Sequence, residues 1–458
     1  MGIPKKGERV KLKIDDLAYG GMGIGKVDEY VIFVEGALPG EEVVAEVFKR
    51  KKNYAEAKLI QVENESEFRI TPRCKHFPLC GGCRLQHLDY DRQAEFKKEQ
   101  LTGQLRQIGG LDNPPVSRLI KSETPFYYRN KMEYSFGVSR EGQLQLGLHP
   151  RRSFGKIFQL DECYLQSEKS AELVRKIRET ASGMGLPGYH VRKHTGLLRY
   201  MVIREGKNTN QRMMNIVTSE SAEKQVGELC ETAINDFGDI DSIVNNINTK
   251  KANIAYGEYE NLIHGEPYII ENIGDIKYKI SANSFFQSNS LTAVKLFNAV
   301  VEQAACNGSE RVLDLYCGTG SIAFSMSRQA DKLIGVDSEE AAIEDARLNS
   351  ELNGITNCEF YVRDSLDYLN ILIGQGERFD VIVADPPRPG LHPKMIPLLG
   401  RMASPKLIYV SCNPSALARD YAGLKEVGFK LEDVICVDMF PQTPHIEAVA
   451  LFKYAQSN

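Results

Sequence analysis

The sequence predicts a multidomain protein: an N-terminal OB-like β-barrel, a central α+β domain with a cysteine cluster, and a C-terminal Rossmann-like α/β domain. Three observations support this prediction. The chain has 458 residues, more than one hydrophobic core usually serves. Residues 8–62 contain short β-rich runs separated by turns, whereas strand-like and helix-like runs alternate from residue 291. We expect domains at 1–62, 63–280 and 281–458.

Composition and charge exclude several classes of protein. Hydrophobic residues make up 42% and charged residues 26%, which excludes a disordered chain. No apolar run approaches the roughly 20 residues of a membrane-spanning helix, and residues 1–6 lack the apolar stretch of a secretory signal. We therefore expect a cytoplasmic, monomeric protein without membrane contact.

The charge is unevenly distributed along the chain. The net charge is −4, but residues 121–156 hold seven Lys/Arg against three Glu, whereas residues 311–458 hold 14 Lys/Arg against 20 Asp/Glu. This pattern is compatible with a polyanion bound on one face. An ordinary scatter of surface charge explains it equally well.

The first domain is predicted from β-branched and aromatic runs at 10–14, 30–34, 42–48 and 54–60. The segment Tyr19-Gly-Gly-Met-Gly-Ile-Gly25 lies between the first two runs, and its four glycines permit tight turns. Four or five strands in this length favour an OB-type barrel, a frequent oligonucleotide platform. Lys49-Arg-Lys-Lys52 beside Tyr54 suits phosphate contact and base stacking, or is a solvated hairpin tip.

The middle of the chain begins with clustered cysteines. Cys74, Cys80 and Cys83 are separated by five and two residues, and Cys163 follows after 79 more. Thiols this close in a cytoplasmic protein indicate a metal site rather than disulfides. The gap of five residues favours a [4Fe–4S] cluster, while zinc or unligated thiols remain alternatives.

Secondary structure in the middle region is mixed. A polar, helical stretch is expected through about Ile108, until Asp112-Asn-Pro-Pro115 breaks it. Strand-like runs such as 198–204 and 212–217 then alternate with helical runs such as 167–183. We expect an antiparallel sheet with helices on one side.

A glycine-rich loop marks a cofactor site in the last domain. Residues 311–316 are a predicted strand, Cys317-Gly-Thr-Gly320 a loop, and Ser321 the start of a helix. Asp337 ends the next strand, 19 residues after Gly318, where a carboxylate can accept ribose hydroxyls. Because the loop also fits the pattern GxGxxA, it indicates either NAD or S-adenosylmethionine.

Three later strand ends carry polar groups. Asp385-Pro-Pro-Arg388 follows an apolar strand, and prolines there hold the carboxylate rigidly in a way typical of sites that place a flat base against a methyl donor. Cys412 ends the strand 407–411, where it is either a core residue or a nucleophile. Glu447 interrupts an apolar run, so it either has a task or faces water from an edge strand.

Four segments together resemble the bacterial RNA uracil-C5 methyltransferases. These are Asp314-Leu-Tyr-Cys-Gly-Thr-Gly320, Asp385-Pro-Pro-Arg388, Ser411-Cys-Asn-Pro414 and His445-Ile-Glu447. The resemblance is greatest to the branch that modifies 23S ribosomal RNA and carries an N-terminal TRAM domain and an iron–sulfur cluster. It covers nearly the whole chain, with residues 8–62 matching the TRAM barrel.

The resemblance implies an enzyme that transfers a methyl group from S-adenosylmethionine to C5 of a uridine in 23S ribosomal RNA. It assigns Cys412 as the nucleophile and Glu447 as the base. It also implies a methyl-donor pocket formed by Gln287, Tyr316, Ser321, Asp337, Asp364 and Asp385. In addition, it implies a [4Fe–4S] cluster bound by Cys74, Cys80, Cys83 and Cys163. Phe285 or Phe286 could stack on a flipped base.

The chemistry explains these two catalytic residues. Uracil C5 is a weak carbon nucleophile, but a thiolate added at C6 makes C5 enolate-like. A base must then remove the C5 proton so that the thiolate can leave. A free thiol has a pKa of about 8.5, and Arg388 and the cationic methyl donor are candidates for lowering it.

Four other functions remain open from the sequence. The same chemistry could act on a transfer RNA. An RNA base N-methyltransferase would share Asp385-Pro-Pro-Arg388 but needs no nucleophilic cysteine. An oxidoreductase that uses NAD would bind nicotinamide, and a non-catalytic RNA-binding protein would have no use for Cys412 and Glu447.

Overall fold

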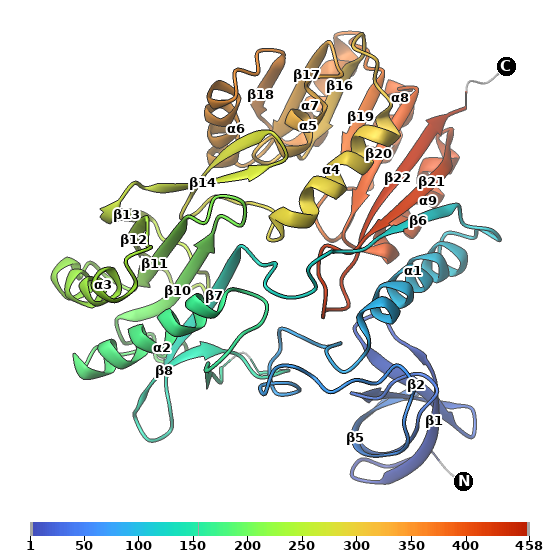
Figure 1. The fold of residues 1–458 in the computed structure, drawn as a ribbon. Helices are drawn as coiled ribbons and strands as arrows, with labels where there is room; N and C mark the ends of the chain where they lie inside the picture. The colour runs from blue at the N-terminus through green and yellow to red at the C-terminus, as the bar shows by residue number, and fades with distance from the viewer. Residues whose placement is uncertain (1–2, 154, 456–458) are drawn as a thin grey trace.

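The computed structural model describes residues 3–153 and 155–455. The barrel, the central sheet and the C-terminal α/β domain are separate bodies, and the barrel lies below the other two (Figure 1). Residues 1–2, which belong to the segment 1–6 that was compared with a secretory signal, lie outside the described residues. No helix in the described ranges is long and apolar enough to cross a membrane.

The N-terminal strands close into a barrel, as predicted, in the order β1-β2-β3-β5-β4. Alternate residues such as Ile32 and Val34 point inward and are fully buried. Its strands are β1 (Arg9–Leu17), β2 (Met22–Val27), β3 (Tyr30–Glu35), β4 (Glu42–Arg50) and β5 (Tyr54–Asn64).

Only part of the glycine-rich segment is a turn. Gly20 and Gly21 have φ of 107° and 81°, which favours glycine, and they form the turn after β1. Gly23 and Gly25 instead belong to β2. A Cβ on Gly25 would lie 2.2 Å from the carbonyl oxygen of Lys13, so glycine is needed there for β2 to approach β1.

The central domain is a mixed sheet with helices on one face. Helices α2 and α3 pack their apolar residues onto it, as expected. One pair of neighbouring strands differs from the expected antiparallel arrangement. Strands β11 and β12 are parallel, because α3 connects them as a crossover. The elements are β7 (Lys131–Val138), β8 (Leu144–Leu148), β9 (Phe158–Gln159), α2 (Glu168–Gly183), β10 (Leu198–Glu205), β11 (Arg212–Thr218), α3 (Glu223–Phe237), β12 (Ser242–Ile247) and β13 (Tyr259–Gly265).

The C-terminal domain is a doubly wound sheet in the order β18-β17-β16-β19-β20-β22-β21-β6. One face packs against α4, α5 and α6, and the other against α1, α7, α8 and α9. Its elements are α4 (Ser290–Ala304), β16 (Arg311–Leu315), α5 (Ser321–Met326), β17 (Lys332–Asp337), α6 (Glu340–Leu352), β18 (Cys358–Val362), α7 (Ser365–Gly374), β19 (Val381–Ala384), α8 (Met395–Met402), β20 (Lys406–Ser411), α9 (Pro414–Glu426), β21 (Phe429–Val437) and β22 (Glu447–Tyr454).

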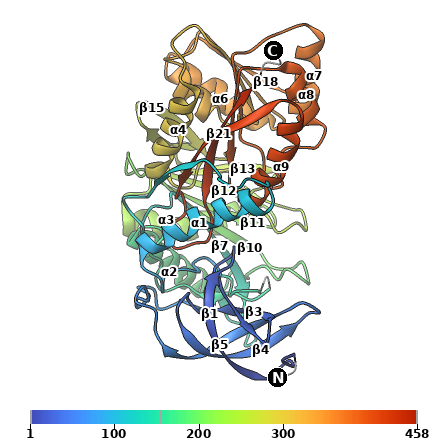
Figure 2. The same cartoon turned by 90° about the vertical axis from the view of Figure 1, so that its right-hand side faces the viewer.

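Elements from the region expected to be central also belong to this C-terminal core. Helix α1 (Tyr90–Gln107) buries Leu101 and Leu105 against it, and β6 (Val116–Ile120) pairs with β21. The hairpin β14 (Tyr268–Ile273) and β15 (Ile276–Ser281) packs on α4 and α6. Helix α1 therefore lies between the barrel and the C-terminal sheet (Figure 2).

Candidate active site

One edge of the C-terminal sheet gathers the predicted site residues. The parallel strands β16 to β20 all end there, and Tyr316, Asp337, Asp364, Asp385 and Cys412 lie at or just after these ends. Strand β22 runs antiparallel to β20, with Ser411 paired to Ala448. Its first residue, Glu447, therefore lies at the same edge as Cys412.

The loop after β16 has two glycines in the left-handed region, and one of them packs against the interior of the domain. Gly318 and Gly320 have φ of 53° and 80°, and a Cβ on Gly320 would lie 2.8 Å from the ring of Phe324. The Gly318 amide donates to Oδ2 of Asp337 at 2.9 Å. This bond holds the glycine loop against the carboxylate that was predicted to bind a ribose.

The other residues predicted to bind the methyl donor have the following surroundings. Burial and the carboxylates of Asp364, Asp420 and Asp337 raise the pKa of Tyr316 to about 12, so these acidic groups lie near its hydroxyl. Asp364 is exposed and caps α7 by accepting from Leu366 N at 2.9 Å. Gln287 is held by its carbonyl oxygen, which accepts from Asn130 Nδ2 at 2.6 Å.

Burial distinguishes the two phenylalanines that were predicted as stacking candidates. Phe286 is 7% exposed and packs edge-on against Tyr278, whereas Phe285 is 68% exposed. Of the two rings, only that of Phe285 is therefore accessible to a base. The Ser321 hydroxyl lies 3.4 Å from the Thr319 hydroxyl.

Asp314 is a buried carboxylate near Asp337 and Asp385 to which the sequence prediction gave no role. It is 1% exposed on β16, and burial together with nearby Asp385 and Asp337 raises its pKa well above the usual range. The signal that identified Glu447, a carboxylate that interrupts an apolar strand, applies equally to Asp314. It adds a further acidic group beneath the cofactor loop.

Cys412 and Glu447 influence each other electrostatically. Burial, Glu447 and Asp385 raise the pKa of the Cys412 thiol to about 11, while Arg388 opposes this shift through its charge and a hydrogen bond. Burial and Asp385 raise the pKa of Glu447, which is 7% exposed, well above its usual range. As predicted, Arg388 lowers the pKa of Cys412, but in this structure burial raises that pKa by more.

Arg388 is held beside Cys412 and Glu447 by contacts of its backbone carbonyl and of its guanidinium. Asn413 Nδ2 donates to its carbonyl oxygen at 3.0 Å, and its guanidinium lies 3.2 Å from Nδ1 of His445. Burial and the nearby Arg388 lower the pKa of His445 to about 4, so the ring is neutral at pH 7 and accepts from the guanidinium. The cation thus remains beside the thiol and the carboxylate.

The segment 438–446, which precedes Glu447, is anchored by other parts of the chain. Asn289 Nδ2 donates to Met439 O at 2.9 Å, and the Tyr128 hydroxyl donates to Pro441 O at 3.0 Å. Lys97 on α1 donates to Oδ1 of Asp438 at 2.6 Å and to Phe440 O at 3.0 Å. Three regions remote in sequence therefore determine where β22 and its first residue, Glu447, begin.

The four clustered cysteines line a single cavity of about 540 Å³. Burial raises the pKa of Cys74, Cys80 and Cys163, and raises that of Cys83 to about 12. The Gly82 amide donates to Sγ of Cys80 at 3.3 Å. The chain thus brings together thiols from two distant segments, as the spacing predicted.

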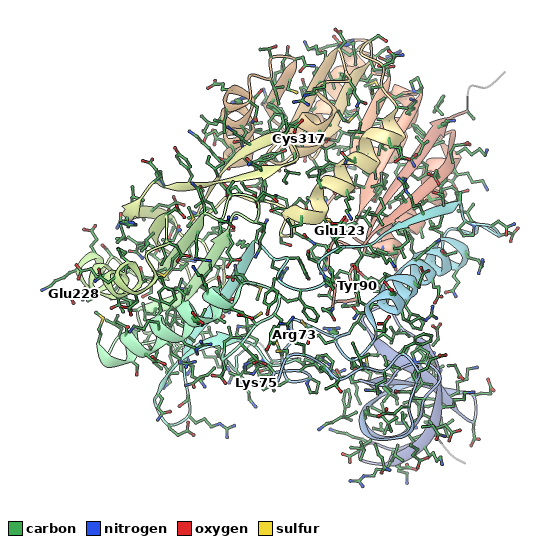
Figure 3. The ribbon with its side chains drawn as sticks, in the orientation of Figure 1. Arg73, Lys75, Tyr90, Glu123, Glu228 and Cys317 are labelled. Carbon is green, nitrogen blue, oxygen red and sulfur yellow. The ribbon has the colours of Figure 1, made fainter. Side chains whose placement is uncertain are left out.

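The cysteine segment is fastened at both ends. Arg73, beside Cys74, lies 4.3 Å from the ring centre of Tyr164 and donates to the Tyr127 hydroxyl at 2.9 Å (Figure 3). Arg151 donates to the carbonyl oxygens of Cys80 and Cys83 at 3.2 and 2.7 Å. Arg151 belongs to the basic range 121–156, and the structure gives it this internal role.

No metal site is shown by side-chain geometry. In the described part of the chain, no three or more His, Cys, Asp or Glu side chains are arranged to hold a metal ion. The side-chain geometry of the described residues therefore does not show the metal site that the sequence predicted.

The predicted basic surface is only partly free. Lys49 forms an ion pair with Glu56, and Arg152 pairs with Glu35 and Glu56. Arg50, Lys51 and Lys52 remain exposed at the tip between β4 and β5. The tip therefore offers these three cations to a polyanion.

Comparison with protein families gives two matches. The family described as tRNA (uracil-5-)-methyltransferase matches residues 260–454, and the TRAM domain matches residues 5–60. The first match spans the strand ends that carry Cys412 and Glu447, and the second spans the barrel.

Whole-chain relatives agree with these matches. An uncharacterized RNA methyltransferase of Halalkalibacterium halodurans is 39% identical over 98% of this chain and 97% of its own length. One of Clostridium acetobutylicum is 37% identical, with 98% of both chains covered. The crystal structure of Pyrococcus abyssi tRNA (uracil-54, C5)-methyltransferase with S-adenosyl-L-homocysteine superposes with a TM-score of 0.77, at 33% identity, over 96% of this chain and 99% of that one. The chain therefore belongs to the S-adenosylmethionine-dependent RNA uracil-5-methyltransferases.

Proposed function

We propose that the protein methylates C5 of a uridine in 23S ribosomal RNA through a covalent bond between Cys412 and C6 of uracil. The observation that carries this proposal is the pairing of Cys412 and Glu447 at one sheet edge, next to the cofactor loop. An N-methyltransferase would need neither a thiol nor a second acid at this place.

The residues act in a defined order. The Cys412 thiolate adds to C6, and the electrons of the C5–C6 double bond move to C5 as an enolate. S-adenosylmethionine, when bound, would supply the methyl group to C5, and the methyl–sulfonium bond would break with release of S-adenosylhomocysteine. The Glu447 carboxylate then takes the C5 proton, the double bond forms again, and the bond between Sγ and C6 breaks.

The electrostatics of the site support a requirement for the methyl donor. Burial and Asp385 raise the pKa of both Cys412 and Glu447, and Glu447 raises that of Cys412 further. A positively charged ligand among Asp314, Asp337 and Asp385 would lower the pKa of both groups. Donor binding would therefore activate the nucleophile and the base together.

Ribosomal and transfer RNA are distinguished by mapping the product. We expect a strain that lacks this gene to lose one or more 5-methyluridines from 23S ribosomal RNA, as detected by mass spectrometry of RNA fragments. Complementation with the wild-type gene, but not with the Cys412→Ala gene, should restore them. Loss from transfer RNA alone would favour the second candidate, which the solved relative named for uracil-54 of tRNA supports.

We also propose that Cys74, Cys80, Cys83 and Cys163 hold a [4Fe–4S] cluster that supports the RNA-binding surface. The shared cavity and the amide directed at Cys80 carry this proposal. Arg129 and Lys131 line the same cavity, so the cluster would lie beneath basic side chains. With Arg50, Lys51 and Lys52 on the barrel, these residues would contact phosphates.

The cluster has a direct chemical test. Protein purified without oxygen should be brown and contain about four irons per chain. Replacing Cys74, Cys80, Cys83 or Cys163 by Ser should remove color and iron, while Cys306→Ser, outside the cavity, should not. A colorless protein that contains zinc would contradict the cluster.

A further inference from the structure

The turn between β1 and β2 connects the barrel to the methyltransferase domain. Arg84 Nη1 donates to the carbonyl oxygen of Gly20 at 3.1 Å. A Cβ on Gly21 would lie 3.1 Å from the side chain of Leu85, so the turn packs tightly on residues 84 and 85. This packing holds the turn in one place relative to Arg84.

Residues 84 and 85 also bind the segment that leads to Glu447. The backbone amides of Arg84 and Leu85 both donate to Gln442 O, at 2.9 and 3.1 Å. The segment between β21 and β22 extends from the sheet toward the barrel (Figure 1). A two-residue bridge therefore joins the barrel turn to the segment that positions Glu447.

Tyr19 directly precedes this turn, which the contacts above hold beside the segment that leads to Glu447. Arg388, Cys412 and Glu447 are near enough to act electrostatically on its hydroxyl, and burial raises its pKa. Tyr19 is 42% exposed, compared with 7% for Glu447. The Tyr19 ring is therefore accessible from solvent, whereas Glu447 is buried.

We propose that Tyr19 is a substrate-contacting residue, whose ring stacks on the base of a nucleotide next to the target uridine. An exposed aromatic ring beside the cations Arg84 and Arg388 has the composition of single-stranded RNA sites, where bases stack and phosphates pair. The target base itself must be reached by Cys412 and Glu447 deeper in the pocket. This inference rests on the proposed function, and it makes the barrel part of the active site.

Two substitutions distinguish the contribution of the Tyr19 ring from that of its hydroxyl. Tyr19→Ala should lower kcat/KM for RNA methylation about 10- to 100-fold, since base stacking on an aromatic ring has an effect of this size. Tyr19→Phe should stay within about twofold of wild type, because the ring is kept. As a matched control, Tyr259→Ala removes a ring that is 66% exposed on the distant edge strand β13 and should have no effect.

An abasic RNA identifies the contact. Removing the base on the 5′ or the 3′ side of the target uridine should weaken RNA binding by the wild-type protein at one of these two positions. At that position, the same removal should not weaken RNA binding by the Tyr19→Ala variant any further. Additive losses at both positions, or wild-type activity of Tyr19→Ala, would overturn the inference. Calorimetric binding of S-adenosyl-L-homocysteine and the melting temperature should not change, which excludes misfolding.

The same measurements separate this inference from the proposed function. If wild-type protein forms no denaturation-resistant adduct with RNA that contains 5-fluorouridine, the proposed function fails. If it forms the adduct and Tyr19→Ala forms it equally fast, only the role of Tyr19 fails.

Discussion

Cys412→Ala should bind RNA and S-adenosylmethionine but transfer no methyl group, because C5 is never activated. The expected loss is roughly 10⁴-fold or more, the size typical of removing an enzyme's nucleophile. The measurement is transfer of labelled methyl to RNA. Cys306→Ala, a half-buried cysteine away from the site, is the matched control and should retain activity. Methylation by Cys412→Ala would contradict the nucleophilic mechanism.

Glu447→Gln should fail at a later step of the same reaction. The thiolate still adds and C5 still takes the methyl group, but the C5 proton stays, so a covalent protein–RNA complex with labelled methyl should accumulate. RNA with 5-fluorouridine should trap wild-type protein in the same way, since fluorine does not leave as a proton does. Glu432→Gln on neighbouring β21 should give no trapped complex with ordinary RNA.

Lys97→Met should lower the free energy of unfolding by about 3–5 kcal/mol, the usual cost of leaving one member of a buried ion pair alone. Lys97 and Asp438 are 1% and 0% exposed, and Oδ2 of Asp438 has no hydrogen-bond partner among the described residues. Urea denaturation provides the measurement. Lys98→Met, at the next and more exposed position of α1, should change stability by less than about 1 kcal/mol.

The double variant Lys97→Met/Asp438→Asn shows whether the loss of stability comes from the unpaired charge or from altered packing. Removing both charges should restore much of the stability, because no unpaired charge then remains buried. Methylation should stay low in both variants if the pair positions the segment before Glu447. A single variant as stable as wild type would show that Asp438 finds another partner.

Local patterns in the sequence predicted the barrel and the strand ends well. The β-rich runs gave four of the barrel strands, and only β2 was hidden, because Gly23 and Gly25 have low strand propensity. Strand β2 forms nonetheless, since β1 can approach only a strand without side chains at these positions. The membership of α1 and β6 in the C-terminal core was also hidden, because a sequence pattern shows which face is apolar but not what covers it.

The sequence by itself determined the chemistry available to this protein: a thiol and a carboxylate at strand ends, a glycine loop followed by Asp337, and four clustered cysteines. These features are local, since a residue type at a strand end needs only its neighbours to be recognized. The tertiary structure decided which groups act on one another. Burial keeps Cys412 protonated despite Arg388, and Arg151 is directed inward to the cysteine segment. Tyr19, on the barrel, lies near enough to Arg388 and Glu447 for their charges to act on its hydroxyl. Desolvation and contacts across hundreds of residues depend on the folded chain, so no sequence pattern contains them.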